Sequence, residues 1–257
     1  MTSEANEAGG NSPRGHFSEL LKVEGKLALR EPYGVFGVIF PALLLVLFAF
    51  ISSENPGTVG STGFTVLDLY IPTIVVIGFI TIALSLPNSL VRDREIGWLR
   101  RVSTTPVHPS RLLAAQLILN LIFAVVMVLT VTFGGEVVFG AALDVNIPLF
   151  ILAIVLSIAV IFSLGLVVAA VAPSQTASSA LGGVFMFGLL FLSGLWVQPA
   201  LVGGPLQTIM YYSPSGAAAR TLLSSVFNTA PPYEAMVTMV AYTAIFTLLA
   251  IRYFRWE

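Results

Sequence analysis

Residues 147–171 read IPLFILAIVLSIAVIFSLGLVVAAV and lie within the longest charge-free part of this 257-residue chain. No Asp, Glu, Lys or Arg occurs from Val145 to Ala219. A helix crosses the hydrocarbon core of a bilayer with about 20 mostly apolar residues, so this part of the sequence is too long for one crossing. The polar segment Pro173-Ser174-Gln175 divides it, and the sequence therefore predicts two membrane spans, 147–171 and 176–197.

Four further stretches have the length and composition of membrane-spanning helices, namely 33–52, 71–90, 112–134 and 236–251. Each is a continuous apolar run, whereas the strands of a membrane barrel would alternate apolar and polar residues. The composition agrees, because 10% of the residues are charged and the mean hydropathy is +0.93, while soluble domains have about 25% charged residues. We therefore expect an all-α membrane protein with six transmembrane helices, in which a flexible cytoplasmic tail (1–15) precedes one transmembrane domain (16–257).

The distribution of basic residues predicts how the spans are oriented. Of the 12 Lys and Arg residues, all except Arg220 precede the first span, separate the second from the third, or follow the sixth. An even number of spans places these three segments on one side, which the positive-inside rule identifies as cytoplasmic. The opposite side then carries Arg220 together with Glu54, Asp68, Glu136, Asp144 and Glu234. Both termini are therefore expected in the cytoplasm.

The sequence lacks the residues that several functional classes require. The sequence has no Cys and only two His, His16 and His108, which leaves no ligands for a cysteine- or histidine-built metal centre. Its net charge of −1 gives no reason to expect nucleic-acid binding. No Gly-x-x-x-x-Gly-Lys-Ser/Thr motif is present to hold nucleotide phosphates, and no base, nucleophile and orienting group occur together. Residues 1–13 lack the apolar core of a cleavable signal peptide. We expect a chain that is not an enzyme and binds no metal or cofactor itself.

Residues 17–30 form a candidate helix at the membrane surface before the first span. Phe17, Leu20 and Leu21 can share an apolar side, while Lys22 and Lys26 face water and anionic lipid headgroups. The alternative is an ordinary polar leader to the first span.

Residues 191–228 are too apolar for a free loop, yet prolines and glycines interrupt them repeatedly. Non-helical backbone at membrane depth is tolerated only where protein buries it or where it lines a cavity. We therefore predict a re-entrant pair of short helices on the outer side, 206–212 and 217–227. The alternative is one long span followed by a surface loop.

The segment 92–101, RDREIGWLRR, concentrates charge between the second and third spans. Arg94, Trp98 and Arg101 fall on one face of a predicted helix, which Thr104-Thr105-Pro106 ends. One interpretation is positive-inside anchoring, with Trp98 among the headgroups. The other is a docking helix that carries motion from a soluble protein into the membrane domain.

This segment resembles the cytoplasmic coupling loop of ABC-2 type transporter permeases. The residues that match the family pattern are Arg94, Glu95, Gly97, Leu99, Thr105 and Pro106. The sequence departs from that pattern at Trp98 and at Arg100-Arg101, where the family commonly has a Thr or Ser and an acidic residue. A second resemblance to the family lies in Ser193-Gly194-Leu195-Trp196 with Pro199, in Ser213-Pro214, and in Arg220 shortly after that proline.

The resemblance implies the membrane subunit of an ABC exporter, in the daunorubicin-resistance or drug-efflux-like branch, in a bacterial plasma membrane. Two copies of a separate ATP-binding subunit would bind ATP and Mg, and a second permease subunit, identical or related, would complete the complex. The residues implied to couple the two kinds of subunit are Arg94, Glu95, Gly97, Trp98, Leu99, Arg100, Arg101, Thr105 and Pro106. The cargo is expected to be a hydrophobic or amphipathic drug or lipid. The alternatives are a polysaccharide- or glycolipid-exporting permease, an ion-coupled carrier, and a scaffold that transports nothing.

Six residues are candidates for a transport pathway: Gln116, Asn120, Phe187, Phe191, Trp196 and Arg220. The two amides lie one turn apart on the third span and could instead form hydrogen bonds between helices. The aromatic side chains could instead face lipid. Arg220 could pair with Glu234, Glu136 or Asp68, or it could attract an anionic substrate. Asp68 and Glu136 lie at the ends of predicted spans, so we expect them to be exposed among the headgroups.

Overall fold

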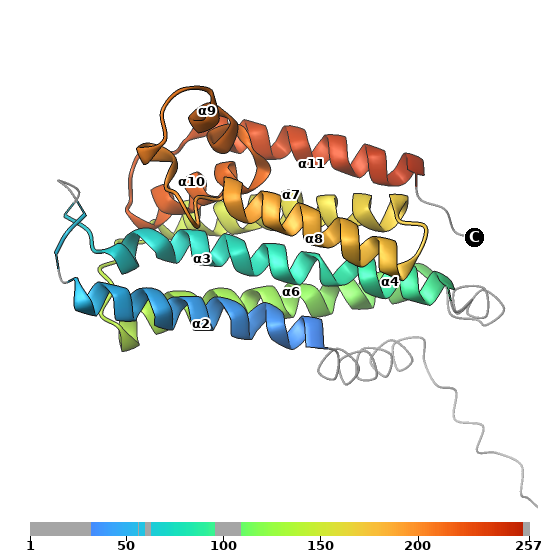
Figure 1. The fold of residues 1–257 in the computed structure, drawn as a ribbon, viewed down its shortest axis with the longest axis horizontal. Helices are drawn as coiled ribbons and strands as arrows, with labels where there is room; N and C mark the ends of the chain where they lie inside the picture. The colour runs from blue at the N-terminus through green and yellow to red at the C-terminus, as the bar shows by residue number, and fades with distance from the viewer. Residues whose placement is uncertain (1–31, 56, 60–62, 96–108, 254–257) are drawn as a thin grey trace, which may run out of the picture.

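The structure, a computed structural model, describes residues 32–55, 57–59, 63–95 and 109–253 (Figure 1). The described part is helical, without strands, and confirms the all-α fold. The long helices are α2 (Pro32–Glu54), α3 (Val66–Ala83), α4 (Ser85–Glu95), α6 (Pro109–Phe133), α7 (Ile147–Val171), α8 (Gln175–Leu192) and α11 (Tyr233–Tyr253). Two shorter helices are α9 (Gly204–Tyr212) and α10 (Pro214–Val226). A π-helical turn, Gly134–Val138, continues α6, and a 3-10 turn spans Pro199–Leu201.

Six helical segments of the described chain are long and apolar enough to cross a membrane, as predicted. They are Val35–Glu54, Val66–Arg92, Gln116–Val138, Ile147–Val171, Gln175–Leu192 and Tyr233–Tyr253. The predicted tail (1–15), the predicted interfacial helix (17–30) and most of the predicted coupling segment lie outside the described residues.

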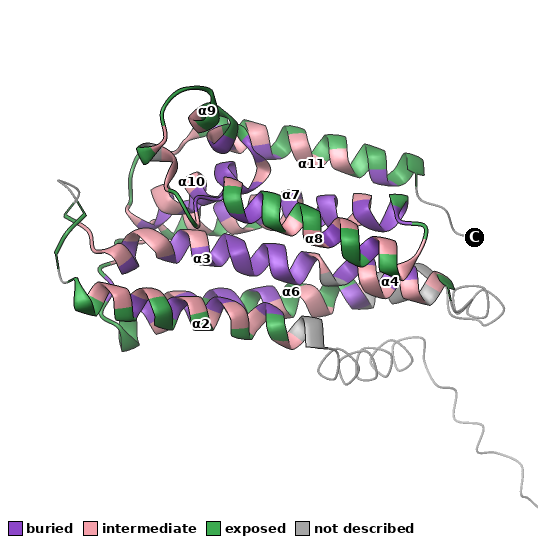
Figure 2. Ribbon diagram, viewed as in Figure 1, coloured by how far each residue is buried: buried purple, intermediate pink, exposed green. Residues whose placement is uncertain are grey.

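The helices form an elongated bundle with α3 at its centre (Figure 1). α3 packs against α2, α6, α7 and α10, and Ile71, Ile74 and Ile77 are fully buried. The outer helices α2 and α11 instead expose much of their apolar surface (Figure 2). Lipid is as apolar as these side chains, so exposure of this kind is expected in a membrane protein. We call the two ends of the bundle the α4 end and the α10 end.

The second predicted span consists of two helices rather than one. α3 ends at Ala83 and α4 begins at Ser85. Pro87 is the physical reason, because proline has no N–H to donate to the carbonyl four residues earlier, that of Ala83, and its ring crowds that carbonyl. α7 approaches closely at this break, where a Cβ on Gly165 would lie 2.8 Å from the Ala83 carbonyl oxygen.

The fifth span is shorter than predicted, because α8 ends at Leu192 rather than near residue 197. Ser193 caps the helix, and Gly194 follows with a φ of +90°, a conformation that side chains with a Cβ rarely adopt.

The short helices α9 and α10 confirm the predicted helix pair between the fifth and sixth spans. Ser213 makes the corner between them: its Oγ donates to the Met210 carbonyl (2.8 Å) and accepts from the Gly216 N–H (3.0 Å). A Cβ on Gly216 would lie 1.8 Å from the Met210 carbonyl oxygen, so only glycine fits there. α10 packs against α3, α7, α8 and α11, and most of its residues are buried. The Ser215 hydroxyl also donates to the Leu189 carbonyl of α8 (2.8 Å).

Candidate functional site

At the α4 end, two adjacent charged residues contact the turn that joins α7 to α8. α7 ends in the capping residue Ala172, and Gln175 begins α8. The Arg94 guanidinium donates a hydrogen bond to the Ala172 carbonyl. The Glu95 carboxylate accepts one from the Gln175 N–H at 3.0 Å. The end of α4 is thereby attached to the fourth and fifth spans at once.

The charges of Arg94 and Glu95 match the electrostatics of the two helix ends. The last carbonyls of a helix carry partial negative charge, and its first N–H groups carry partial positive charge. Arg94 lies at the carboxyl end of α7 and Glu95 at the amino end of α8, so each interaction is favourable. A displacement of residues 94–95 would therefore act on α4, α7 and α8 together.

Of the nine predicted coupling residues, the structure describes Arg94 and Glu95. Gly97, Trp98, Leu99, Arg100, Arg101, Thr105 and Pro106 lie outside the described residues, and their role stays a prediction. Sequence reasoning did not find the partner of Arg94 and Glu95, the α7–α8 turn, although it recognised Pro173-Ser174-Gln175 as the boundary between two spans.

The two amide residues proposed for the pathway form hydrogen bonds inside the protein. Gln116 of α6 is buried, and its Oε1 accepts from the Ser89 hydroxyl of α4 at 3.5 Å. The Asn120 side chain donates to the Gln116 carbonyl in its own helix at 2.8 Å. A second polar contact that sequence reasoning missed joins α4 to α8, where the Ser179 hydroxyl donates to Asn88 at 3.1 Å. The presence of Asn88 within a predicted apolar span could have indicated this contact.

The three aromatic candidates point away from the core of the subunit. Phe187 is 65% exposed and Trp196 is 55% exposed. Phe191, one turn after Phe187 on α8, is also exposed. Lipid or another subunit would cover this face.

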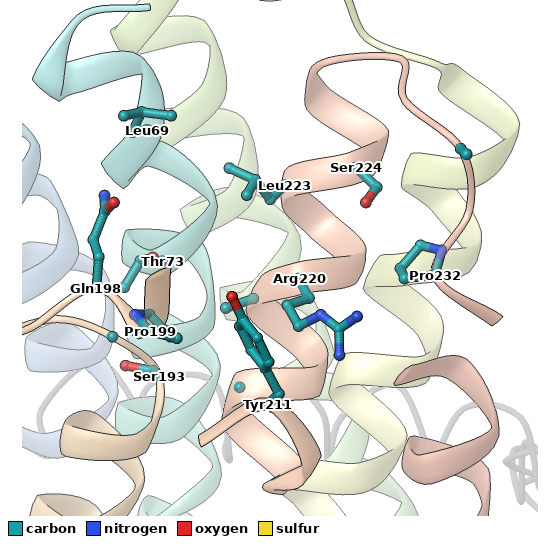
Figure 3. A pocket seen from close by; sticks show the side chains of 14 residues that line it. Leu69, Thr73, Ser193, Gln198, Pro199, Tyr211, Arg220, Leu223, Ser224 and Pro232 are labelled. Atoms are coloured by element: carbon teal, nitrogen blue, oxygen red, sulfur yellow. The ribbon is translucent and has the colours of Figure 1, made fainter. Parts of the chain in front are cut away.

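At the α10 end, Arg220 lines a cavity of about 470 Å³ (Figure 3). The cavity lies between the first turns of α3, the segment after α8, and helices α9 and α10. Its polar lining residues are Thr73, Ser193, Gln198, Tyr211, Arg220 and Ser224, and its apolar ones include Leu69, Pro199, Leu223 and Pro232.

Arg220 contacts an aromatic ring rather than a carboxylate. Its guanidinium carbon lies 4.6 Å from the centroid of the Tyr211 ring, a cation–π geometry. Among the described residues, no ion pair joins Arg220 to Asp68, Glu136 or Glu234, which sequence reasoning offered as partners. Two of these carboxylates, those of Asp68 and Glu234, accept hydrogen bonds from other residues.

Asp68 is buried, which differs from the expected headgroup exposure. One carboxylate oxygen accepts from the Thr65 N–H (2.8 Å) as part of a capping box at the start of α3. The other accepts from the Ala142 N–H (3.0 Å) in the connection between α6 and α7. One carboxylate thus joins the start of α3 to the connection between α6 and α7. Glu136 is exposed, as expected.

Glu234, at the start of α11, accepts a hydrogen bond from the Tyr212 hydroxyl of α9 at 3.0 Å. This hydrogen bond, with the negative charge of Glu234, raises the pKa of Tyr212 above its ordinary value. Tyr212 therefore stays protonated and remains a donor at neutral pH, joining the short helices to the sixth span.

Comparison with protein families assigns most of the chain to a family model. Residues 16–227 match the sequence model of the family described as ABC-2 type transporter. The match includes α2 to α10, and with them the Arg94–Glu95 contact, the α7–α8 turn and Arg220. A comparison with curated proteins found no match.

Proposed function

The chain belongs to the ABC-2 type transporter family, and from this premise we propose that it is the membrane-spanning subunit of an ATP-driven exporter. ATP hydrolysis takes place on a separate ATP-binding subunit, which also holds the Mg. The observation that carries the proposal is the joint attachment of Arg94 and Glu95 to the α7–α8 turn. These are the first two residues of the segment that resembles the coupling loop.

The contact suggests a route for the coupling. The ATP-binding subunit docks on the segment that begins at Arg94, on the cytoplasmic side of the membrane. Its closure on ATP shifts that segment, and α4 moves with the ends of α7 and α8 because hydrogen bonds join them. The break at Leu84 between α3 and α4 gives α4 a place at which to tilt relative to the buried α3.

The proposed complex contains two ATP-binding subunits and a second permease subunit, in a bacterial plasma membrane with both termini of this chain in the cytoplasm. The cargo is a hydrophobic or amphipathic molecule, drug-like or lipid-like. The outward-facing aromatic side chains Phe187, Phe191 and Trp196 support this choice, because flat rings offer apolar contact to such molecules.

The test is reconstitution with the ATP-binding partner. After gentle extraction, the wild-type chain should co-purify with a stoichiometric ATPase whose activity depends on the permease. Arg94→Glu together with Arg101→Glu should abolish that dependence and leave membrane insertion intact. Arg252→Glu is the matched control, because Arg252 is an exposed arginine in the last turn of α11, on the same side of the membrane.

Two results would contradict the proposal at different levels. If no ATPase co-purifies, the chain is not an exporter subunit of this type. If an ATPase co-purifies but the double variant transports like wild type, the exporter stands and the docking role of the charged segment is wrong.

A further inference from the structure

The cavity at the α10 end has the size and lining of a ligand site. Its volume of about 470 Å³ falls within the range of about 300–1,000 Å³ that small-molecule sites occupy, and a mostly apolar lining with a few convergent polar groups is typical of them. Figure 3 shows Thr73 and Gln198 on one side of the cavity and Arg220 and Ser224 on the other.

The polar groups in this cavity have hydrogen-bonding capacity that the protein leaves unused. Within the described residues, the side chains of Thr73, Gln198 and Ser224 form no hydrogen bond, and Arg220 forms no ion pair. Arg220 stacks on Tyr211, which leaves the donors at the edge of its guanidinium available. Arginine near lipid is unfavourable without a partner, so a bound anion would remove that cost.

The cavity lies at the depth of lipid headgroups. Leu69 and Thr73 belong to the first two turns of the span that begins at Val66, and Pro232 immediately precedes the span that begins at Tyr233. Two spans therefore enter the bilayer at the level of this cavity. A molecule that is anionic at one end and apolar at the other could place its charge here and its chains beside the bundle.

We propose that this cavity binds the phosphate group of an anionic amphipathic molecule, with Arg220 as its principal ligand. A guanidinium can donate two parallel hydrogen bonds to phosphate oxygens. The hydroxyls of Thr73 and Ser224 and the amide of Gln198 add three neutral donors. Phosphate offers more acceptor oxygens than a carboxylate, so it fits this number of donors better. The site is independent of the proposed export function, because binding requires neither ATP nor the partner subunit.

The experiment is native mass spectrometry of the purified full-length chain, titrated with dioleoyl phosphatidylglycerol or dioleoyl phosphatidylcholine, which share their acyl chains. The wild-type chain should bind the anionic lipid about tenfold more tightly or better, and Arg220→Gln should weaken that binding about ten- to a hundredfold while binding of the zwitterionic lipid is unchanged. Arg252→Gln, the same change at the α4 end, should bind like wild type. Gel filtration of each variant establishes that it is folded.

Two further variants keep the test decisive if Arg220→Gln fails to fold. Arg220→Lys keeps the charge but loses the paired donors, and Ser224→Ala removes one donor; each should weaken binding of the anionic lipid several-fold. Equal binding of the two lipids by the wild-type chain would overturn the proposal. So would equal losses in Arg220→Gln and Arg252→Gln.

Competition by glycerol 3-phosphate identifies the source of the phosphate. Displacement of phosphatidylglycerol by this soluble compound would show that the site reads the phosphate alone and accepts a water-soluble anion. Resistance to displacement would show that the acyl chains contribute and that the ligand is a lipid. Both results uphold the phosphate site. If the wild-type chain binds neither lipid, the phosphate site is wrong, and the proposed export function is judged by its own reconstitution test.

Discussion

Glu95 accepts a hydrogen bond from the backbone N–H of Gln175, at 3.0 Å and across 80 positions of the sequence. Gln175 is the first residue of α8, so the carboxylate lies where a helix presents unpaired N–H groups and partial positive charge. The preceding residue, Arg94, satisfies a carbonyl at the end of α7. The adjacent residues Arg94 and Glu95 therefore form hydrogen bonds with both ends of the turn between two spans.

Glu95→Ala should weaken coupling more than it weakens the fold. Loss of one charge-assisted hydrogen bond at an exposed position costs about 1 kcal/mol, which corresponds to about a fivefold loss in an equilibrium that depends on the contact. We expect transport by the reconstituted complex to fall by about that factor. Glu95→Gln retains a side-chain oxygen as acceptor and should recover most of the activity. Wild-type transport by Glu95→Ala would contradict a role for this contact.

Asp68→Ala should destabilise the α10 end of the bundle. The carboxylate is buried and accepts from the backbone of both Thr65 and Ala142, so its removal leaves two donors without acceptors, at about 2–4 kcal/mol in total. Asp68→Asn keeps one acceptor oxygen and should lose about half as much. Glu136→Ala, at an exposed carboxylate that forms no side-chain hydrogen bond within the described residues, is the control and should change the free energy of unfolding by less than about 0.5 kcal/mol. Thermal unfolding in detergent measures all three, and equal stability of Asp68→Ala and wild type would refute the role given to Asp68.

Gly216→Ala should prevent correct folding of the corner between α9 and α10. The added Cβ would lie 1.8 Å from the Met210 carbonyl oxygen, a backbone atom that cannot move without displacing the corner, and we expect a loss of about 3 kcal/mol or more. Gly188→Ala is the matched control, because a Cβ there meets nothing within 4 Å. Gel filtration should show a lower yield and aggregated protein for Gly216→Ala, and the wild-type yield and elution profile for Gly188→Ala.

Phe187→Ala separates a pathway role from a structural one. Phe187 is 65% exposed, whereas Phe79 is fully buried. Phe79→Ala should therefore cost about 3–5 kcal/mol of stability, and Phe187→Ala should cost less than about 0.5 kcal/mol. If α8 contributes to the pathway, Phe187→Ala should still slow efflux of a hydrophobic dye from vesicles that contain the complex. Unchanged efflux with unchanged stability would assign Phe187 to lipid contact.

Much of this fold could be predicted from local sequence. Apolar length locates the six spans, and the charge-free fourth span begins and ends at the residues predicted for it, 147 and 171. The prolines and glycines of residues 191–228 indicate two short helices, since their effect on the backbone is local. The break at Leu84 could also have been predicted, because Pro87 is present in the sequence. Hydropathy alone does not predict it, because the apolar run continues past this position.

The contacts between distant segments could not be predicted in this way. Asp68 at the end of a span suggests headgroup exposure, and only the folded chain brings Ala142 to it. Arg220 suggests an ion pair, yet its neighbour is the ring of Tyr211, which lies nine positions away across a corner that Gly216 makes possible. Periodicity and composition carry no information about which residues meet across such distances.

The burial of α10 has a mechanical consequence for transport. This helix packs against five others, α3, α7, α8, α9 and α11, and the hydroxyl of Ser215 donates a hydrogen bond to the end of α8. A segment held in this way cannot swing aside as an independent gate, because closely packed interiors shift between discrete arrangements rather than deform. It stays fixed relative to the helices that it packs against. Any opening at the α10 end therefore has to come from whole spans, or whole subunits, moving apart as rigid bodies.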